Sequence, residues 1–282
     1  MKKLILLTLL VPFIAWPCDD GIVQHNFKEV PEHSILSNGM TEADFLGTIK
    51  KFENYFAPLI ERDHRSELIV YKSWSSNTIN AYADKKPRRV EITVFGGLAR
   101  YKSMTNDSLM LTLCHELGHH FGGYPKKSGN KWSSAEGQAD YYSTAKCLRR
   151  VWEADDNIAI MSKVEVPALV KNECELTYKS EGERALCARM SLAGKGMALL
   201  FQYLESDSIE PKFETPEREM ARAMNYMHPF AQCRLDTYFQ GAVCSVPESI
   251  EFENDDETTG ACHGKLGFTR GLRPGCWFFT RR

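Results

Sequence analysis

The chain has 282 residues, of which 43% are hydrophobic and 26% are charged. This length and balance are typical of one large globular domain or two small ones, with enough apolar residues to form a core. The formal net charge of −2 leaves no basic excess, so nucleic acid is not expected as a partner.

The N-terminus has the pattern of a signal peptide. Two lysines precede an almost entirely apolar run from Leu4 to Ala15, which is too short to span a bilayer. We predict a signal peptide at residues 1–17, export to the periplasm or the exterior, and no integral membrane segment after its removal. Lipid anchoring at Cys18 is a minor alternative, because Trp16 and Pro17 are not the small residues that a lipoprotein site requires.

The cysteine count also indicates an oxidising compartment. Nine cysteines are present, and none forms a CxxC pair that would indicate a redox enzyme. Cys114 and Cys147 lie on two predicted helices and either bridge each other or remain buried thiols. Six more are predicted to pair with their nearest neighbours in sequence: Cys174 with Cys187, Cys233 with Cys244, and Cys262 with Cys276.

The first predicted elements are a helix and three strands. Thr41 and Asp44 form a capping-box pattern at the start of a helix that should run to about Ile60. Its predicted core stripe has helical spacing and consists of Phe45, Ile49, Phe52 and Phe56. The strands are predicted at Glu67–Trp74, Thr78–Ala83 and Arg89–Phe95, with a turn at Pro87. They predict a small antiparallel sheet beside a helix.

Helices dominate the remainder. Thr105 or Asn106 can cap a helix that ends near Gly122, and Ser133 or Ser134 can cap a second helix. Further helices are predicted over about residues 183–204, 216–227 and 230–241, followed by a loop-rich segment held by disulfides. The predicted fold class is therefore α+β.

The stretch from His115 to His120 has the sequence HELGHH. On a helix, the i and i+4 spacing of His115 and His119 places both imidazoles on one face. His120 lies off this face and is expected to make a structural hydrogen bond. With Glu116 between them, the two histidines form the pattern of a zinc hydrolase.

The third metal ligand is expected from the next helix. The pattern with a third histidine six residues after His119 fails, because that position is Pro125. Glu136 stands 17 residues after His119, far enough for the chain to turn back. Asp140 lies one helical turn beyond Glu136 and can orient a ligand imidazole.

Three protein ligands leave an open zinc position, which is typical of catalytic rather than structural sites. In such a site the water pKa falls to about 7, and Glu116 acts as the general base that later passes the proton to the leaving amine. A second donor would help to stabilise the oxyanion. The predicted cofactor is one catalytic Zn²⁺ ion.

These motifs resemble those of the gluzincin metallopeptidases, in particular the CAAX prenyl proteases, the HtpX-type proteases and their soluble periplasmic relatives. The resemblance covers about residues 80–234. It is carried by the sequences NAYA at 80–83, FGGL at 95–98, HELGH at 115–119, EGQAD at 136–140 and HPFAQCR at 228–234. It implies that His115, His119 and Glu136 bind zinc, that Glu116 is the base, and that Asp140 supports a ligand. It further implies that His228 and Arg234 approach the substrate carbonyl, and that residues 91–95 pair with an extended substrate.

The chain also departs from this family. The 17-residue gap before Glu136 is short, the transmembrane helices of the prenyl proteases are absent, and the cysteine-rich C-terminus has no counterpart. We predict a zincin-like metallopeptidase domain at residues 18–243 and a C-terminal extension at residues 244–282.

The predicted function is that of an exported zinc metalloendopeptidase acting on protein or peptide substrates. Three alternatives remain open at this point. The chain could be a zinc-containing peptide-binding or chaperone-like module with little or no turnover. It could be a disulfide-rich structural domain with an accidental motif, or a zinc hydrolase that acts on another bond.

Overall fold

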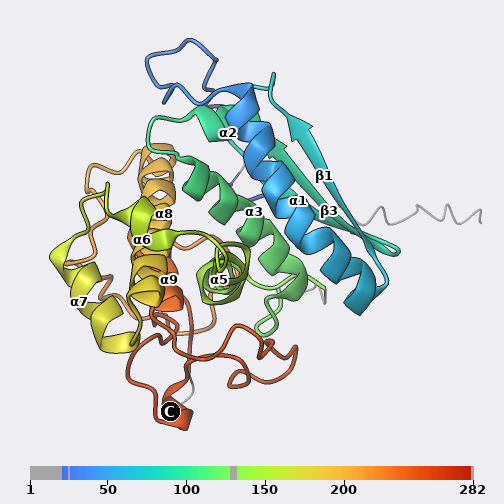
Figure 1. Cartoon of the computed structure of the whole chain (residues 1–282). Coiled ribbons are helices and arrows are strands. Elements are labelled where there is room, and N and C mark those ends of the chain that lie inside the picture. Colours follow the sequence, from blue (N-terminus) through green and yellow to red (C-terminus); the bar gives the residue numbers. More distant parts are fainter. Residues whose placement is uncertain (1–20, 25, 128–131, 281–282) are drawn as a thin grey trace, which may run out of the picture.

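Figure 1 shows a computed structural model of the chain, which describes residues 21–24, 26–127 and 132–280. The predicted signal peptide and Cys18 lie outside the described residues. The fold is α+β, as predicted: a small sheet with a mainly helical remainder. Among the described helices, none combines the length and apolar character that a bilayer span requires.

The first helix packs against the sheet through the predicted aromatic stripe. Helix α1 (Glu42–His64) begins with the capping box of Thr41 and Asp44 and runs four residues beyond the predicted end. It lies along strand β1 (Glu67–Ser73) and beside helix α3 (Asn106–Phe121), as Figure 1 shows. The predicted stripe of Phe45, Ile49, Phe52 and Phe56 is buried there.

The sheet is mixed, and the prediction of an antiparallel sheet is wrong. Strand β3 (Arg89–Phe95) lies between β1 and β2 (Ala81–Lys86). It pairs antiparallel with β2 through the predicted turn, and parallel with β1. The parallel pairing arises because the chain passes from β1 to the far side of β3 before the hairpin begins.

The two helices of the HELGHH and EGQAD motifs pack closely together. Helix α3 is capped by Thr105, whose hydroxyl accepts from the backbone N–H of Ser108 at 3.1 Å. After the loop comes α4 (Glu136–Tyr142), which continues through a π-helical turn, η1 (Ser143–Cys147), into α5 (Leu148–Val151). A Cβ on Gly118 would lie 2.9 Å from the Ala139 backbone, so the glycine permits the close approach of the two helices.

The short helix α2 (Gly96–Arg100) follows β3 and lies beside α1. The later helices form the other side of the molecule (Figure 1): α6 (Asn157–Met161), α7 (Ala168–Thr177), α8 (Glu181–Glu205) and α9 (Ala231–Ala242). The two long ones, α8 and α9, pack on each other and agree closely with the predicted ranges. Helix α8 contacts α3 and helix α9 contacts α4, so both support the helices that carry the motifs.

The helix predicted over residues 216–227 is wrong. The backbone N–H of Glu217 donates to the Asp236 carboxylate at 2.7 Å. Those of Ala221 and Asn225 donate to the carbonyls of Gly275 and Trp277 at 2.8 and 2.9 Å. These donors are paired with distant parts of the chain, so the segment lies along the C-terminal tail instead of closing helical turns.

Two of the predicted local disulfides are also wrong. The Cys174–Cys187 bridge is confirmed, and Cys114 is bonded to Cys147, which joins α3 to η1. The other four cysteines form Cys233–Cys276 and Cys244–Cys262. Cys233 and Cys244 lie near opposite ends of α9, and eleven residues of helix separate them by roughly 16 Å, far beyond the reach of a disulfide.

The C-terminal segment is mostly loop, with one short 3₁₀ turn, η2 (Gly264–Leu266), and it supports α4. The indole of Trp277 lies so close to Gly137 that a Cβ there would be 2.3 Å from the ring. Tyr141 donates to the Gly271 carbonyl at 2.5 Å, and Arg273 donates to Gln138 at 3.1 Å. Contacts at Gly137, Gln138 and Tyr141 therefore hold α4 against the C-terminal segment.

Candidate metal centre

Helix α3 presents two imidazoles to the interior at its C-terminal half. His115 and His119 are fully or almost fully buried, and their ring centroids lie 4.8 Å apart. This is the arrangement expected from i and i+4 positions on one helix face. His120 points elsewhere and lies against Trp132 with a ring separation of 4.9 Å, as expected for a residue off this face.

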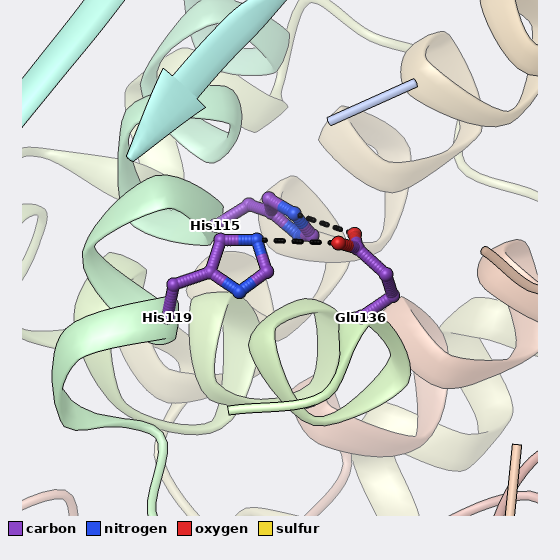
Figure 2. Close-up of side chains that lie close together, drawn as sticks. All are labelled: His115, His119 and Glu136. Atoms are coloured by element: carbon purple, nitrogen blue, oxygen red, sulfur yellow. Dashed lines mark ion pairs between the residues drawn. The ribbon is translucent and has the colours of Figure 1, made fainter. Parts of the chain in front are cut away.

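Helix α4 brings Glu136 to the two histidines. Figure 2 shows both imidazoles turned toward its carboxylate. His115 Nε2 lies 3.3 Å from Glu136 Oε2, and His119 Nε2 lies 3.6 Å from Glu136 Oε1. The three potential ligand atoms all lie within 4.8 Å of one another, so this buried cluster could hold a metal ion.

The other ring nitrogens are held in a way that suits metal binding. His115 Nδ1 lies 2.7 Å from Asp140 Oδ1, and His119 Nδ1 lies 2.9 Å from the Ser134 carbonyl. Each Nδ1–H can donate to its oxygen, which directs Nε2 toward Glu136, where it can bind a proton or a metal ion. The structure thus places Asp140 where the sequence predicted an orienting carboxylate.

The charges in the cluster favour a cation. Burial on its own would lower the pKa of His115, but Asp140 and Glu136 raise it to about 9. Burial lowers the pKa of His119 well below its usual range, so this imidazole stays neutral. One imidazole is thus held in the neutral form that a metal ion can bind, and the carboxylates around the other attract a positive charge. Zinc accepts this set of two imidazoles and one carboxylate.

Glu116 lies in the same interior but is not one of the three clustered ligands. Its side chain is fully buried, and neither carboxylate oxygen has a hydrogen bond within the described residues. Burial raises the pKa of Glu116 to about 7. A carboxyl group with this pKa can take up and release a proton near neutral pH, as a general base must.

His228 also reaches the cluster. Its Nε2 lies 3.4 Å from Glu136 Oε2 and 2.9 Å from the Gly21 carbonyl. The N-terminal segment therefore passes beside the metal cluster, and its carbonyl already engages this imidazole. The position of His228 is compatible with the predicted role in approaching a substrate carbonyl.

The contacts of Arg234 hold its guanidinium away from a role at a substrate carbonyl. Its guanidinium makes a two-pronged ion pair with Asp140, with distances of 2.7 and 2.8 Å, and donates to the Ile22 carbonyl at 2.6 Å. Tyr238, one turn further along α9, also donates to Asp140, at 2.6 Å. This geometry favours a positioning role, in which Arg234 holds Asp140 and Asp140 holds His115.

We expect the Arg234→Met variant to lose about 3–5 kcal/mol of unfolding free energy, because it leaves the buried Asp140 carboxylate without its cation. Denaturant titration of the full chain measures this, and Arg234→Lys should recover part of the loss. An Arg234→Met protein of normal stability that only turned over slowly would instead support direct action of Arg234 on the substrate.

Comparisons with known proteins add no family to this description. A scan against protein-family models and searches of curated proteins and of solved structures return no match to the chain. The geometry of the centre is therefore the basis for a function.

Four participants in the centre were not predicted from the sequence: Lys127, Tyr238 and the backbone carbonyls of Gly21 and Ile22. Lys127 Nζ lies 2.6 Å from Glu136 Oε1, and the Gly21 and Ile22 carbonyls occupy His228 and Arg234. The helical spacing of Tyr238 from Arg234 was a usable signal for a contact with Asp140. Nothing in the local pattern around Gly21 indicates that it meets a residue more than two hundred positions away.

Proposed function

We propose that this chain is an exported zinc-dependent endopeptidase of gluzincin type. The observation that carries the proposal is the buried arrangement of His115, His119 and Glu136 beside the carboxylate of Glu116, which has no hydrogen bond among the described residues. The four disulfides of the described residues support export to an oxidising compartment. The HExxH, ExxxD and HPxxxxR motifs support the relation to the gluzincins, in particular to the CAAX prenyl and HtpX-type proteases.

Zinc held by the three ligands would polarise a peptide carbonyl and make a water molecule acidic enough to react near neutral pH. Glu116 accepts the proton of the attacking water and delivers it to the leaving amine nitrogen. Asp140 keeps the Nε2 of His115 turned inward, and Arg234 keeps Asp140 ionised and in place. His228 donates to the substrate carbonyl that takes the place of the Gly21 carbonyl.

The predicted substrate strand needs a correction. Residues 91–95 cannot pair with a substrate, because both edges of β3 are already occupied by β1 and β2. The outer edge of β2 is the alternative. Its Ala81 carbonyl accepts a hydrogen bond from the Ile22 N–H at 2.9 Å, and the neighbouring Gly21 carbonyl contacts His228, so the N-terminal segment bonds this edge. We place an extended protein or peptide substrate along this edge, where it takes the place of the Gly21–Val23 segment beside His228.

A peptide library tests the proposed function. We expect the purified full chain to cleave internal bonds, to lose this activity in a chelator, and to regain it with one equivalent of zinc. Mass spectrometry of the products and metal analysis of the protein supply the readouts.

Two outcomes would overturn the proposal. One zinc per chain with peptide binding but no cleavage would indicate a binding or chaperone-like module. No zinc binding would indicate that the histidine and glutamate cluster has no metal function.

A further inference from the structure

The loop between α3 and α4 carries a lysine into the metal centre. On the two sides of residues 128–131, the loop is held as a pair of antiparallel segments. Lys126 forms an isolated bridge with Ser134, and the Lys127 N–H donates to the Ser133 carbonyl at 2.8 Å. Successive side chains of such a segment point to opposite sides. Lys126 donates to Trp132 and Ser134 within the loop, whereas Lys127 reaches the centre.

Lys127 makes a short ion pair with a candidate metal ligand. Its Nζ lies 2.6 Å from Glu136 Oε1, and its side chain is only 18% exposed. Burial has the largest effect on the pKa of four neighbouring groups: it acts to raise the pKa of Glu116 and Glu136 and to lower that of His119 and His228. The positive charge of Lys127 acts to lower the pKa of all four groups. The ammonium therefore acts on the base, on two of the three ligands and on His228 together.

The two cations of the centre differ in the chemistry of their side chains. Arg234 is held by Asp140 through two hydrogen bonds and by the Ile22 carbonyl through a third. Lys127 is a point charge on a flexible stem of four carbons, so its ammonium can change partner while its backbone stays bonded to Ser133. A divalent cation on Glu136 would repel the ammonium and satisfy the same carboxylate.

We infer that Lys127 is a displaceable cation that neutralises Glu136 in the metal-free protein and turns to the substrate carbonyl in the metal-loaded one. There it stabilises the negative charge that develops on the carbonyl oxygen. The first half of this inference concerns metal binding alone, and the second half rests on the proposed peptidase function. Lys127 thus joins His228 as a donor to the substrate carbonyl in place of Arg234, whose donors are bonded to Asp140 and Ile22.

Zinc affinity tests the first half without any turnover. In competition with a chromophoric chelator, we expect Lys127→Met to bind zinc about tenfold more tightly than the natural chain, because a competing positive charge is gone. Lys127→Arg, which keeps the charge, should bind no more tightly than the natural chain. Lys126→Met is the matched control: it removes a neighbouring lysine that bonds only within the loop in the described contacts, and its zinc affinity should not rise.

Kinetics on a peptide substrate tests the second half. We expect Lys127→Met to lower kcat and kcat/KM together by roughly a hundredfold with little change in KM, the signature of an interaction made in the transition state. Thermal melting of each variant checks folding, and Lys127→Gln replaces Lys127→Met if the latter is unstable.

Unchanged or weaker zinc binding by Lys127→Met would overturn the displacement. Normal kcat in a tighter-binding variant would overturn the substrate role. Failure of the natural chain to cleave any peptide would refute the peptidase proposal and the substrate role, whereas the zinc measurement would still decide the displacement.

Discussion

The Glu116→Gln variant is expected to lose peptide hydrolysis by about a thousandfold or more while it still binds one zinc ion. Glu116 is buried beside the ligands without being one of the three clustered donors, and glutamine has the same shape but cannot accept the proton of the attacking water. The variant should also fold normally, because the carboxylate has no hydrogen bond within the described residues that an amide would break.

This prediction is checked by measuring initial cleavage rates together with zinc content for the same preparation. Glu214→Gln, an exposed glutamate outside the centre, serves as the matched control and should behave as the natural chain. Cleavage at normal rates by Glu116→Gln would remove the residue from the mechanism. Loss of zinc from this variant would make Glu116 a ligand.

The Glu136→Ala variant is expected to have the opposite defect. It should lose zinc affinity by at least about a hundredfold, because the centre then offers two imidazoles and no carboxylate ligand. Activity should fall with zinc occupancy and return partly at high zinc concentration. Chelator competition and metal analysis measure the effect. Glu116→Gln is the matched comparison for Glu136→Ala, because both variants remove one negative charge from the same interior.

Full zinc occupancy in Glu136→Ala would show that another group is the third ligand. His228 is the first residue to test in that case, because its Nε2 lies 3.4 Å from Glu136 Oε2. A double variant, Glu136→Ala with His228→Ala, would then lose the zinc that the single variant kept.

Much of the centre could be predicted from the sequence because it depends on short-range geometry. The i and i+4 spacing of His115 and His119 determines where their imidazoles point on any helix. The same spacing places Asp140 one turn from Glu136. The capping box at Thr41 and the cap at Thr105 are likewise local, and the structure shows both.

Other features were predicted wrongly, or could not be predicted, because distant segments compete for the same backbone and side-chain groups. The segment after Thr215 has a helical start pattern, yet its donors bond to Asp236, Gly275 and Trp277. The disulfide prediction failed at α9 because pairing by closeness in sequence ignores the length of a helix between two cysteines. The strand order of the sheet depends on the edge of β3 with which β1 pairs, and no local pattern in β1 determines this edge.

The sequence by itself determined which chemical groups are available to this protein: two imidazoles and a glutamate on one helix, and a carboxylate pair on the next. Only the tertiary structure decided how these groups are supported. In the tertiary structure, Arg234 forms an ion pair with Asp140, and Lys127 forms one with Glu136. The Gly21–Val23 segment lies beside His228. The physical reason is that buried charges and backbone groups must find partners, and those partners come from whichever segments the fold brings within reach.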